Sequence, residues 1–413
     1  MSAAAPTPEE PGAGAPPSVA ARLALYQRVG GIVTPLITAV LAFFIGGLVV
    51  LVVTGNNPLS TYKAIFDGTG LNWFFPWVHG AARTTAAYDL QSTLVYTTPL
   101  ILTGLAVAFA FRAGLFNIGG QGQYAAGSIM AVWIGSSLSG MNGVAHIVLV
   151  VVVAALAGAA VAGLAGFLKA TVGAHEVITT IMINWIFFWL AGYLFGVKGP
   201  LQNVREPSLT QSNDVVQSAK LHVFWGDPIL RGLHIGLFMA LAALVVYWLA
   251  INRTTLGYEV RAVGFNPEAS HYAGISVARN YFLAMAISGM FAGLAGAIDV
   301  LGWKYHLAPD DLQGSTIGFI GIAVALLGRN SAVGVFFSAL LFGSLIQGTS
   351  GQNPHLDPAI FKPEQADNLT VMIQGLILLF VGADVLVLYV WQARKKLRLR
   401  RSRKPEAEAE AST

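Results

Sequence analysis

The sequence has 413 residues, of which 55% are hydrophobic and 11% are charged, and its formal net charge is +4. Ordinary soluble domains carry about 25% charged residues, so this composition excludes most classes of soluble protein and predicts a membrane protein. The absence of cysteine from the sequence excludes disulfides, thiolate metal sites and a cysteine nucleophile.

Apolar stretches follow one another from residue 31 to residue 391, and we interpret them as one all-α polytopic transmembrane domain. A spanning helix needs about 20 mostly apolar residues. This length predicts about ten spans, at 31–54, 93–111, 115–138, 146–168, 176–197, 234–252, 280–301, 315–328, 331–348 and 369–391. The third is rich in glycine and polar amides and the eighth is short, so these two are the least typical of complete spans.

The two ends of the chain differ from the spans. Residues 1–30 are rich in Ala, Pro and Gly and are expected to form a disordered tail without the features of a signal peptide. Residues 392–413 form a basic and then acidic tail. Lys and Arg cluster in it between Arg394 and Lys404, a placement typical of a bilayer surface and not of nucleic-acid binding.

The distribution of Lys and Arg predicts the orientation of the spans. With ten crossings and both termini in the cytoplasm, about twice as many Lys and Arg residues lie inside as outside, which agrees with the positive-inside rule. The external loops are then 55–92, 198–233, 302–314 and 349–368, and one long loop between spans, 253–279, is internal.

The internal loop 253–279 contains the signals of a short helix outside the membrane. Asn266 is a good N-cap, Pro267 suits the first helical position, Glu268 complements the helix dipole, and Gly274 can end the helix. The small and apolar side chains of this helix have no core of their own to enter and are expected to contact a partner protein: Ala269, Tyr272 and Ala273. An ordinary connecting loop with a capped turn is the alternative.

Three segments carry a resemblance to a known family. Residues 260–275 resemble the cytoplasmic coupling loop of permease subunits in ABC importers of the branched-chain amino acid, ribose and nucleoside type. Residues 114–123, Gly-Leu-Phe-Asn-Ile-Gly-Gly-Gln-Gly-Gln, are similar to the Gly-Xaa-Phe-Asn-Ile-Gly-Xaa-Glu-Gly-Gln signature of the nucleoside and simple-sugar branch. Residues 175–184 are similar to its Asn-Glu-Val-Ile-Xaa-Thr-Leu-Met-Leu-Asn segment. The sequence departs from these patterns at Gly120-Gln121 and at His175.

This resemblance implies a permease of type II-like fold in the prokaryotic cytoplasmic membrane, which translocates nucleosides. Simple sugars or branched-chain amino acids are the alternative solutes. The implied partners are a cytoplasmic ATPase subunit, a second permease subunit expected to form a heterodimer, and an extracytoplasmic solute-binding protein or lipoprotein. The coupling helix would contact the ATPase through Gly264, Asn266, Pro267, Glu268, Ala269, Tyr272, Ala273 and Gly274.

The chain is expected to be a transport subunit and not an enzyme. It has no Gly-Xaa-Xaa-Xaa-Xaa-Gly-Lys-Ser/Thr motif, and Lys169 follows a leucine. ATP and Mg²⁺ are therefore assigned to the partner ATPase, and neither a cofactor nor a metal is expected on this chain.

Five residues are candidates for the substrate pathway: Asn117, Gln121, Gln123, Asn184 and Phe188. Amides inside a membrane can bind a polar solute, but they also form hydrogen bonds between helices, so a hinge at 117–123 is the alternative. Asn184 lies midway along its span, where a solute would pass. Phe188 belongs to an aromatic run that can stack on a base or face lipid.

Two functions from other classes are alternatives. Ionisable groups inside a membrane are functional candidates, so a proton-driven carrier would use Asp299 or Asp384, neither of which has an evident basic partner in the sequence. A scaffold or receptor would move no solute. The charged loop 198–233 suits docking of a solute-binding protein, although exposed loops are generally charged.

Overall fold

The structure is a computed structural model that describes residues 39–52, 55–227, 231–350, 353, 355 and 363–382. Both predicted tails, 1–30 and 392–413, lie outside the described residues, as does Asp384 at the end of the last predicted span. Residues Ala42–Ala383 form one compact unit, and the contacts reported below lie within it.

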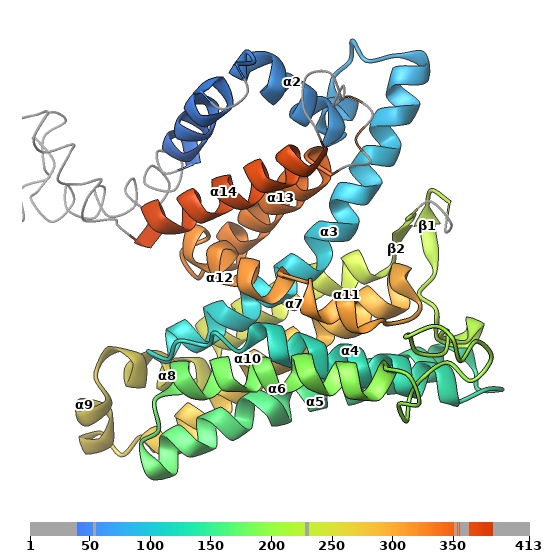
Figure 1. Ribbon diagram of the computed structural model, residues 1–413. Coiled ribbons are helices and arrows are strands. Elements are labelled where there is room, and N and C mark those ends of the chain that lie inside the picture. The colour runs from blue at the N-terminus through green and yellow to red at the C-terminus, as the bar shows by residue number, and fades with distance from the viewer. Residues whose placement is uncertain are drawn as a thin grey trace, which may run out of the picture. The chain divides into compact units, whose positions relative to one another are not determined.

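The described residues are mostly helical (Figure 1). After a first helix, Ala39–Val52, the helices are α2 (Pro58–Gly68), η1 (Leu71–Phe74), α3 (Gly80–Arg112), α4 (Gly120–Ser137), α5 (Gly143–Val172), α6 (Glu176–Phe195), η2 (Gln217–Ala219), α7 (Gly236–Arg253), α8 (Thr255–Phe265), α9 (Pro267–Tyr272), α10 (Val277–Asp299), the π-helical turn η4 (Val300–Lys304), α11 (Pro309–Gln313), α12 (Ile317–Leu327), α13 (Ala332–Gly348) and α14 (Pro363–Gly382). Strands β1 (Val223–Trp225) and β2 (Leu233–His234) pair antiparallel, with Val223 opposite His234.

Among the described residues, six helical segments are long and apolar enough to cross a membrane: Gly80–Arg112, Gly143–Val172, Glu176–Phe195, Gly236–Arg253, Val277–Lys304 and Pro309–Leu327. Three further apolar helices are shorter: Ala39–Val52, Ala332–Gly348 and Asn368–Ile377. The third predicted span starts later than expected, because α4 begins only at Gly120. The protein is therefore a helical polytopic membrane protein.

Glycine allows α5 and α10 to cross with their backbones in contact. A Cβ built on Gly158 would lie 2.2 Å from the Gly289 carbonyl oxygen, and one on Gly289 would lie 2.1 Å from the Gly158 carbonyl oxygen. On its other side, α10 meets α4, where a Cβ on Gly127 would lie 2.2 Å from the Gly293 carbonyl oxygen. These contacts pack α4, α5 and α10 closely against one another.

The four loops predicted as external contact one another. In the loop after α6, the Ser212 and Val215 amides donate to the Leu307 and Tyr305 carbonyls over 2.8 and 2.7 Å. The ring of Trp225 in the same loop lies 5.6 Å from that of Trp73, which follows α2. Asn353, after α13, donates to the Ala64 carbonyl over 3.3 Å. The external loops thus form one face.

The turns predicted as internal gather at another place. The Arg112 guanidinium donates to the Asn330 carbonyl over 2.8 Å, and the Tyr247 hydroxyl donates to the same carbonyl over 2.7 Å. Lys169 and Glu176 form an ion pair of 2.8 Å across the turn between α5 and α6. Figure 1 shows α9 and the β1–β2 hairpin at opposite ends of the helices. The loops predicted as external and the turns predicted as internal therefore lie at different ends of the described helices.

Candidate functional site

The helix predicted in loop 253–279 is present as α9. The Asn266 side chain accepts a hydrogen bond from the Ala269 amide over 3.0 Å, Pro267 occupies the first turn, and Glu268 lies in that turn. After the helix, Gly274 has φ +82°, the left-handed conformation that glycine adopts most easily. The local structure of this segment is therefore the one that the sequence specifies.

The sequence analysis did not predict α8, the helix that carries α9. Thr254 caps α8 by accepting from the Gly257 amide over 3.1 Å. Near its end, a Cβ on Gly264 would lie 2.3 Å from the Arg112 carbonyl oxygen, and Gly114 opposite has φ +73°. Gly264 therefore packs backbone to backbone against the C-terminal end of α3, so α9 is attached to a long apolar helix.

The surface of α9 presents aromatic side chains to solvent. Tyr272 and the preceding Phe265 are each 91% exposed, and the ring of His271 lies 6.4 Å from that of Tyr272. Ala269 and Ala273 are also exposed. Large exposed apolar side chains beside a rigid capped helix are suited to contact with another protein. Next to them, an open pocket of about 560 Å³ is lined by residues that include Lys169 and Tyr281.

The polar amides predicted for the substrate pathway are buried and hydrogen-bonded. Asn117 and Gln123 exchange two side-chain hydrogen bonds of 2.8 and 2.9 Å, and Asn117 also donates to the Ser288 hydroxyl over 2.7 Å. Ser288 in turn donates to the Ala106 carbonyl over 2.6 Å. This network connects α3, α4 and α10.

Two further amides connect α4 to its other neighbours. Asn184 accepts from the Gly122 amide over 2.7 Å and donates to the Ile118 carbonyl over 3.0 Å. Gln121 accepts from the Gly318 amide over 2.8 Å, in the first turn of α12. The structure therefore brings all four predicted amides together around the start of α4, where each bonds to the protein.

Phe188 does not lie with the four amides. Its ring packs edge-on against Trp185 at 5.7 Å, and its carbonyl accepts from Gln313 of α11 over 3.2 Å. Trp185 and Trp189 on the same helix are 54% and 71% exposed. Trp185 and Trp189 therefore face outward from this chain, whereas Phe188 is partly buried.

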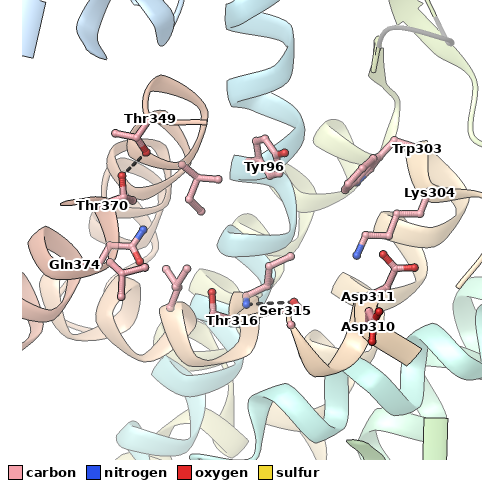
Figure 2. Close-up of a pocket in the computed structure, with 15 residues that line it drawn as sticks. Tyr96, Trp303, Lys304, Asp310, Asp311, Ser315, Thr316, Thr349, Thr370 and Gln374 are labelled. Carbon is pink, nitrogen blue, oxygen red and sulfur yellow. Dashed lines mark hydrogen bonds between the residues drawn. The ribbon is translucent and has the colours of Figure 1, made fainter. Parts of the chain in front are cut away.

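A pocket of about 470 Å³ lies between α3, the end of α10, α11, α12, α13 and α14 (Figure 2). Its side chains mix aromatic, charged and hydroxyl groups. They include Tyr96, Trp303, Lys304, Asp310, Asp311, Thr316, Thr349, Thr370 and Gln374. None of the five predicted pathway residues is among the described residues that line this pocket. Gln121 bonds to Gly318, which follows Ile317 of the pocket wall in the sequence.

Asp299 has a basic partner, contrary to what we expected from the sequence. Lys304 Nζ lies 2.9 Å from Asp299 Oδ2, with the two side chains 10% and 2% exposed. The Tyr124 hydroxyl and Trp303 Nε1 also donate to Asp299, the latter over 2.5 Å. Lys304 donates to the Tyr124 hydroxyl over 3.1 Å. The carboxylate is therefore a fully bonded part of the structure.

The sequence analysis missed this pair because of the helix geometry. Residues five apart do not face each other on an α-helix, but η4 is a π-helical turn in which the Tyr305 amide bonds to the Val300 carbonyl, five residues earlier, over 2.9 Å. Tyr305 then takes φ +60°. Burial raises the pKa of Tyr305, and its hydroxyl donates to the Gly302 carbonyl over 3.0 Å. The sequence signal for this ion pair was an acidic and a basic residue five positions apart, Asp299 and Lys304, with Gly302 between them.

The described residues include no group of three or more His, Asp or Glu side chains placed to hold a metal ion. The described lining of the pocket offers hydrogen-bonding groups, aromatic rings and charges.

Comparison with known proteins gives consistent matches. The family model described as the permease component of branched-chain amino acid transport systems matches residues 90–382. The guanosine ABC transporter permease protein NupP of Bacillus subtilis is 38% identical over 90% of this chain and 99% of its own length. The nucleoside ABC transporter permease protein NupB of Lactococcus lactis is 33% identical over 82% of this chain and 89% of its own length. The glucose ABC transporter permease protein TsgB13 of Haloferax volcanii is 33% identical, over 84% and 86%. No solved structure matches this chain significantly.

Proposed function

We infer that this chain, which belongs to the family of branched-chain amino acid transport system permease components, is the membrane-spanning subunit of an ATP-driven nucleoside importer. The observation that carries this proposal is its similarity, along most of both chains, to permeases named for guanosine and for nucleosides. The chain would form part of the solute pathway and leave ATP and Mg²⁺ to a separate ATPase subunit.

We propose a topology of about ten crossings with a type II-like arrangement in the prokaryotic cytoplasmic membrane, and with both termini in the cytoplasm. The sorting of loops into two clusters supports an alternation of sides along the chain. The transmembrane domain would run over 31–391, with cytoplasmic tails at 1–30 and 392–413.

In this proposal α9 is the contact for the ATPase. It is exposed and capped, and it is attached to α3 through Gly264. The remaining partners would be a second permease subunit, which is expected to be a paralogue, and an extracytoplasmic solute-binding protein docked on the external loops. The four amides around α4 would hold the helices that border the pathway, with Gln121 fixing the start of α12 beside the pocket.

The first test is uptake of labelled uridine and adenosine by cells that carry the complete system, with and without this chain. Uptake should require this chain and ATP and should survive collapse of the proton gradient. Uptake lost on gradient collapse at constant ATP would overturn the proposal in favour of a carrier. The similarity to permease subunits of ABC transporters argues against that carrier.

Glucose is the second candidate solute, because a permease named for glucose is also 33% identical. Labelled glucose and leucine therefore belong in the same assay. Uptake of glucose or leucine that requires this chain, with none of either nucleoside, would replace the nucleoside assignment and leave the importer assignment intact.

A variant tests the role of α9. Ala269→Asp places a charge on the exposed face of α9 without a clash inside the chain, so the protein should insert normally while uptake is lost and ATP hydrolysis becomes uncoupled. Ala82→Asp, at an exposed position in the first turn of α3, is the matched control. Normal uptake by Ala269→Asp would contradict the coupling role.

A further inference from the structure

The pocket between α3, α11, α12 and α14 has two chemically different sides. Figure 2 shows Trp303, Lys304 and Asp311 on one side and Thr349, Thr370 and Gln374 on the other, with Tyr96 of α3 between them. One side therefore offers an aromatic ring and charge, and the other offers hydroxyl and amide groups. A volume of about 470 Å³ lies within the range of small-molecule sites.

The aromatic side is held rigidly. The rings of Tyr96 and Trp303 are 6.1 Å apart and nearly perpendicular. The Arg231 guanidinium lies 4.7 Å from the Trp303 ring centroid and donates to the Tyr96 hydroxyl over 2.5 Å. Trp303 also donates its Nε1 hydrogen to Asp299. The Lys304 ammonium lies 5.3 Å from the same ring centroid, so these contacts hold the indole in one orientation in the pocket wall.

The charged side favours neutral ligands with several hydroxyl groups. Asp310 and Asp311 both line the pocket, whereas the only ammonium in its described lining, that of Lys304, is already bonded to Asp299. One oxygen of Asp311 accepts from the Ala308 amide over 2.8 Å, which orients the carboxylate. Carboxylates accept hydrogen bonds from hydroxyl groups and repel phosphate.

We propose that this pocket is a solute-binding site of the permease itself, which takes a neutral ribonucleoside with the base against Trp303 and the ribose hydroxyls on Asp310 and Asp311. This inference rests on the proposed function and adds to it a selective site inside the membrane subunit. Thr316, Thr349, Thr370 and Gln374 then face the remaining polar edges of the ligand. A sugar lacks the flat ring for Trp303, and a nucleotide brings its phosphate to two carboxylates.

The test is equilibrium binding of labelled adenosine to the purified permease and ATPase complex in lipid nanodiscs, without the solute-binding protein. Adenosine should bind, and AMP should bind at least tenfold more weakly. 2′,3′-Dideoxyadenosine should also bind about tenfold more weakly, because it lacks hydroxyl groups that donate to a charged acceptor.

The variant Asp310→Asn tests the ribose contact while keeping the fold. Asp310 is exposed and its amide isostere keeps the same size. This variant should lose about tenfold in adenosine affinity and bind dideoxyadenosine as the wild type does. Glu206→Gln, an exposed carboxylate in the external loop after α6, is the control and should change neither affinity. Trp303→Phe should weaken both ligands equally.

Equal loss of both ligands in Asp310→Asn, or unchanged binding of both, would overturn the ribose contact. Absence of any adenosine binding to the complex, in a system whose complete form imports adenosine, would overturn the site and leave the proposed function standing. Absence of uptake by the complete system would instead refute the proposed function.

Discussion

Lys304 illustrates how a single residue can be misplaced by sequence reasoning. Because Lys304 follows an apolar run, the sequence predicts that it lies in an external loop. In the structure, the π-helical turn brings its Nζ to 2.9 Å from Asp299 Oδ2. The pair then joins α10 to Tyr124 of α4. A buried ion pair of this kind is costly to break, because removal of one partner leaves the other charge unpaired in a medium of low polarity.

We expect Lys304→Met to destabilise the protein by about 3–5 kcal/mol, the typical effect of breaking a buried pair. The measurement is the thermal unfolding midpoint of the detergent-solubilised protein. The double variant Asp299→Asn with Lys304→Met should recover part of the loss, because no uncompensated charge remains. Lys63→Met, an exposed lysine of α2, should leave the midpoint unchanged. A single variant as stable as the wild type would contradict this role of the pair.

Two glycines of the coupling segment should respond differently to alanine. Gly264→Ala places a Cβ 2.3 Å from the Arg112 carbonyl oxygen, so α8 must move away from α3 and uptake should fall strongly. Gly274→Ala meets no atom within 4 Å and has only the strain of a positive φ, about 1–2 kcal/mol. Uptake divided by the amount of permease inserted in the membrane distinguishes the two variants. If uptake falls no further in Gly264→Ala than in Gly274→Ala, the close contact at Gly264 is not needed for uptake.

At the scale of elements, helix α9 was predictable because its signals are local. Asn266, Pro267 and Gly274 determine the backbone of their own turn, whatever surrounds it. Helix α8 was not predicted, because its stability depends on contact with α3 and α10, which a single sequence does not reveal. The start of α4 was misplaced for a similar reason: residues 115–119 are apolar but non-helical, and they are held by the amide network of Asn117.

Loss of the N-cap should weaken α9 without affecting the bundle. Asn266→Ala removes the acceptor for the Ala269 amide and should cost about 1 kcal/mol in helix stability. Because α9 is the proposed ATPase contact, uptake should fall while the thermal midpoint of the bundle is kept. Ser276→Ala removes the corresponding cap of α10, a long helix packed along its length, and should reduce uptake less. The reverse order of the two effects would contradict the assignment.

For the whole molecule, the amount and sequence order of apolar segments predicted the fold class, and the orientation that the distribution of Lys and Arg predicts stays a prediction. The pocket could not be predicted, because its lining comes from α3, α11, α12, α13 and α14, and none of these carries a recognisable motif there. The predicted amides bond to backbone and side-chain groups of this chain. A polar residue inside a membrane identifies an important position without telling whether its partner is protein or solute.

The absence of cysteine from the whole sequence allows a direct test of topology. Ser208→Cys lies exposed in the loop after α6, and Thr171→Cys lies exposed at the end of α5. A membrane-impermeant maleimide should label the first variant in intact cells and the second only after permeabilisation. The wild type provides a background free of thiols. The opposite pattern would invert the proposed orientation, and labelling of both in intact cells would contradict the separation of the two loop clusters.

Helix α3 connects the pocket to the coupling segment. It is continuous from Gly80 to Arg112, with Tyr96 at the pocket and its last residues against Gly264. About 24 Å of helix, at 1.5 Å per residue, therefore separates the pocket from the coupling segment. Pro99 interrupts its hydrogen bonding three residues beyond Tyr96, so the helix can bend there while both halves stay straight. In the proposed function, a displacement of α9 would reach the pocket through this helix, and Pro99 is the point at which its two ends can move relative to each other.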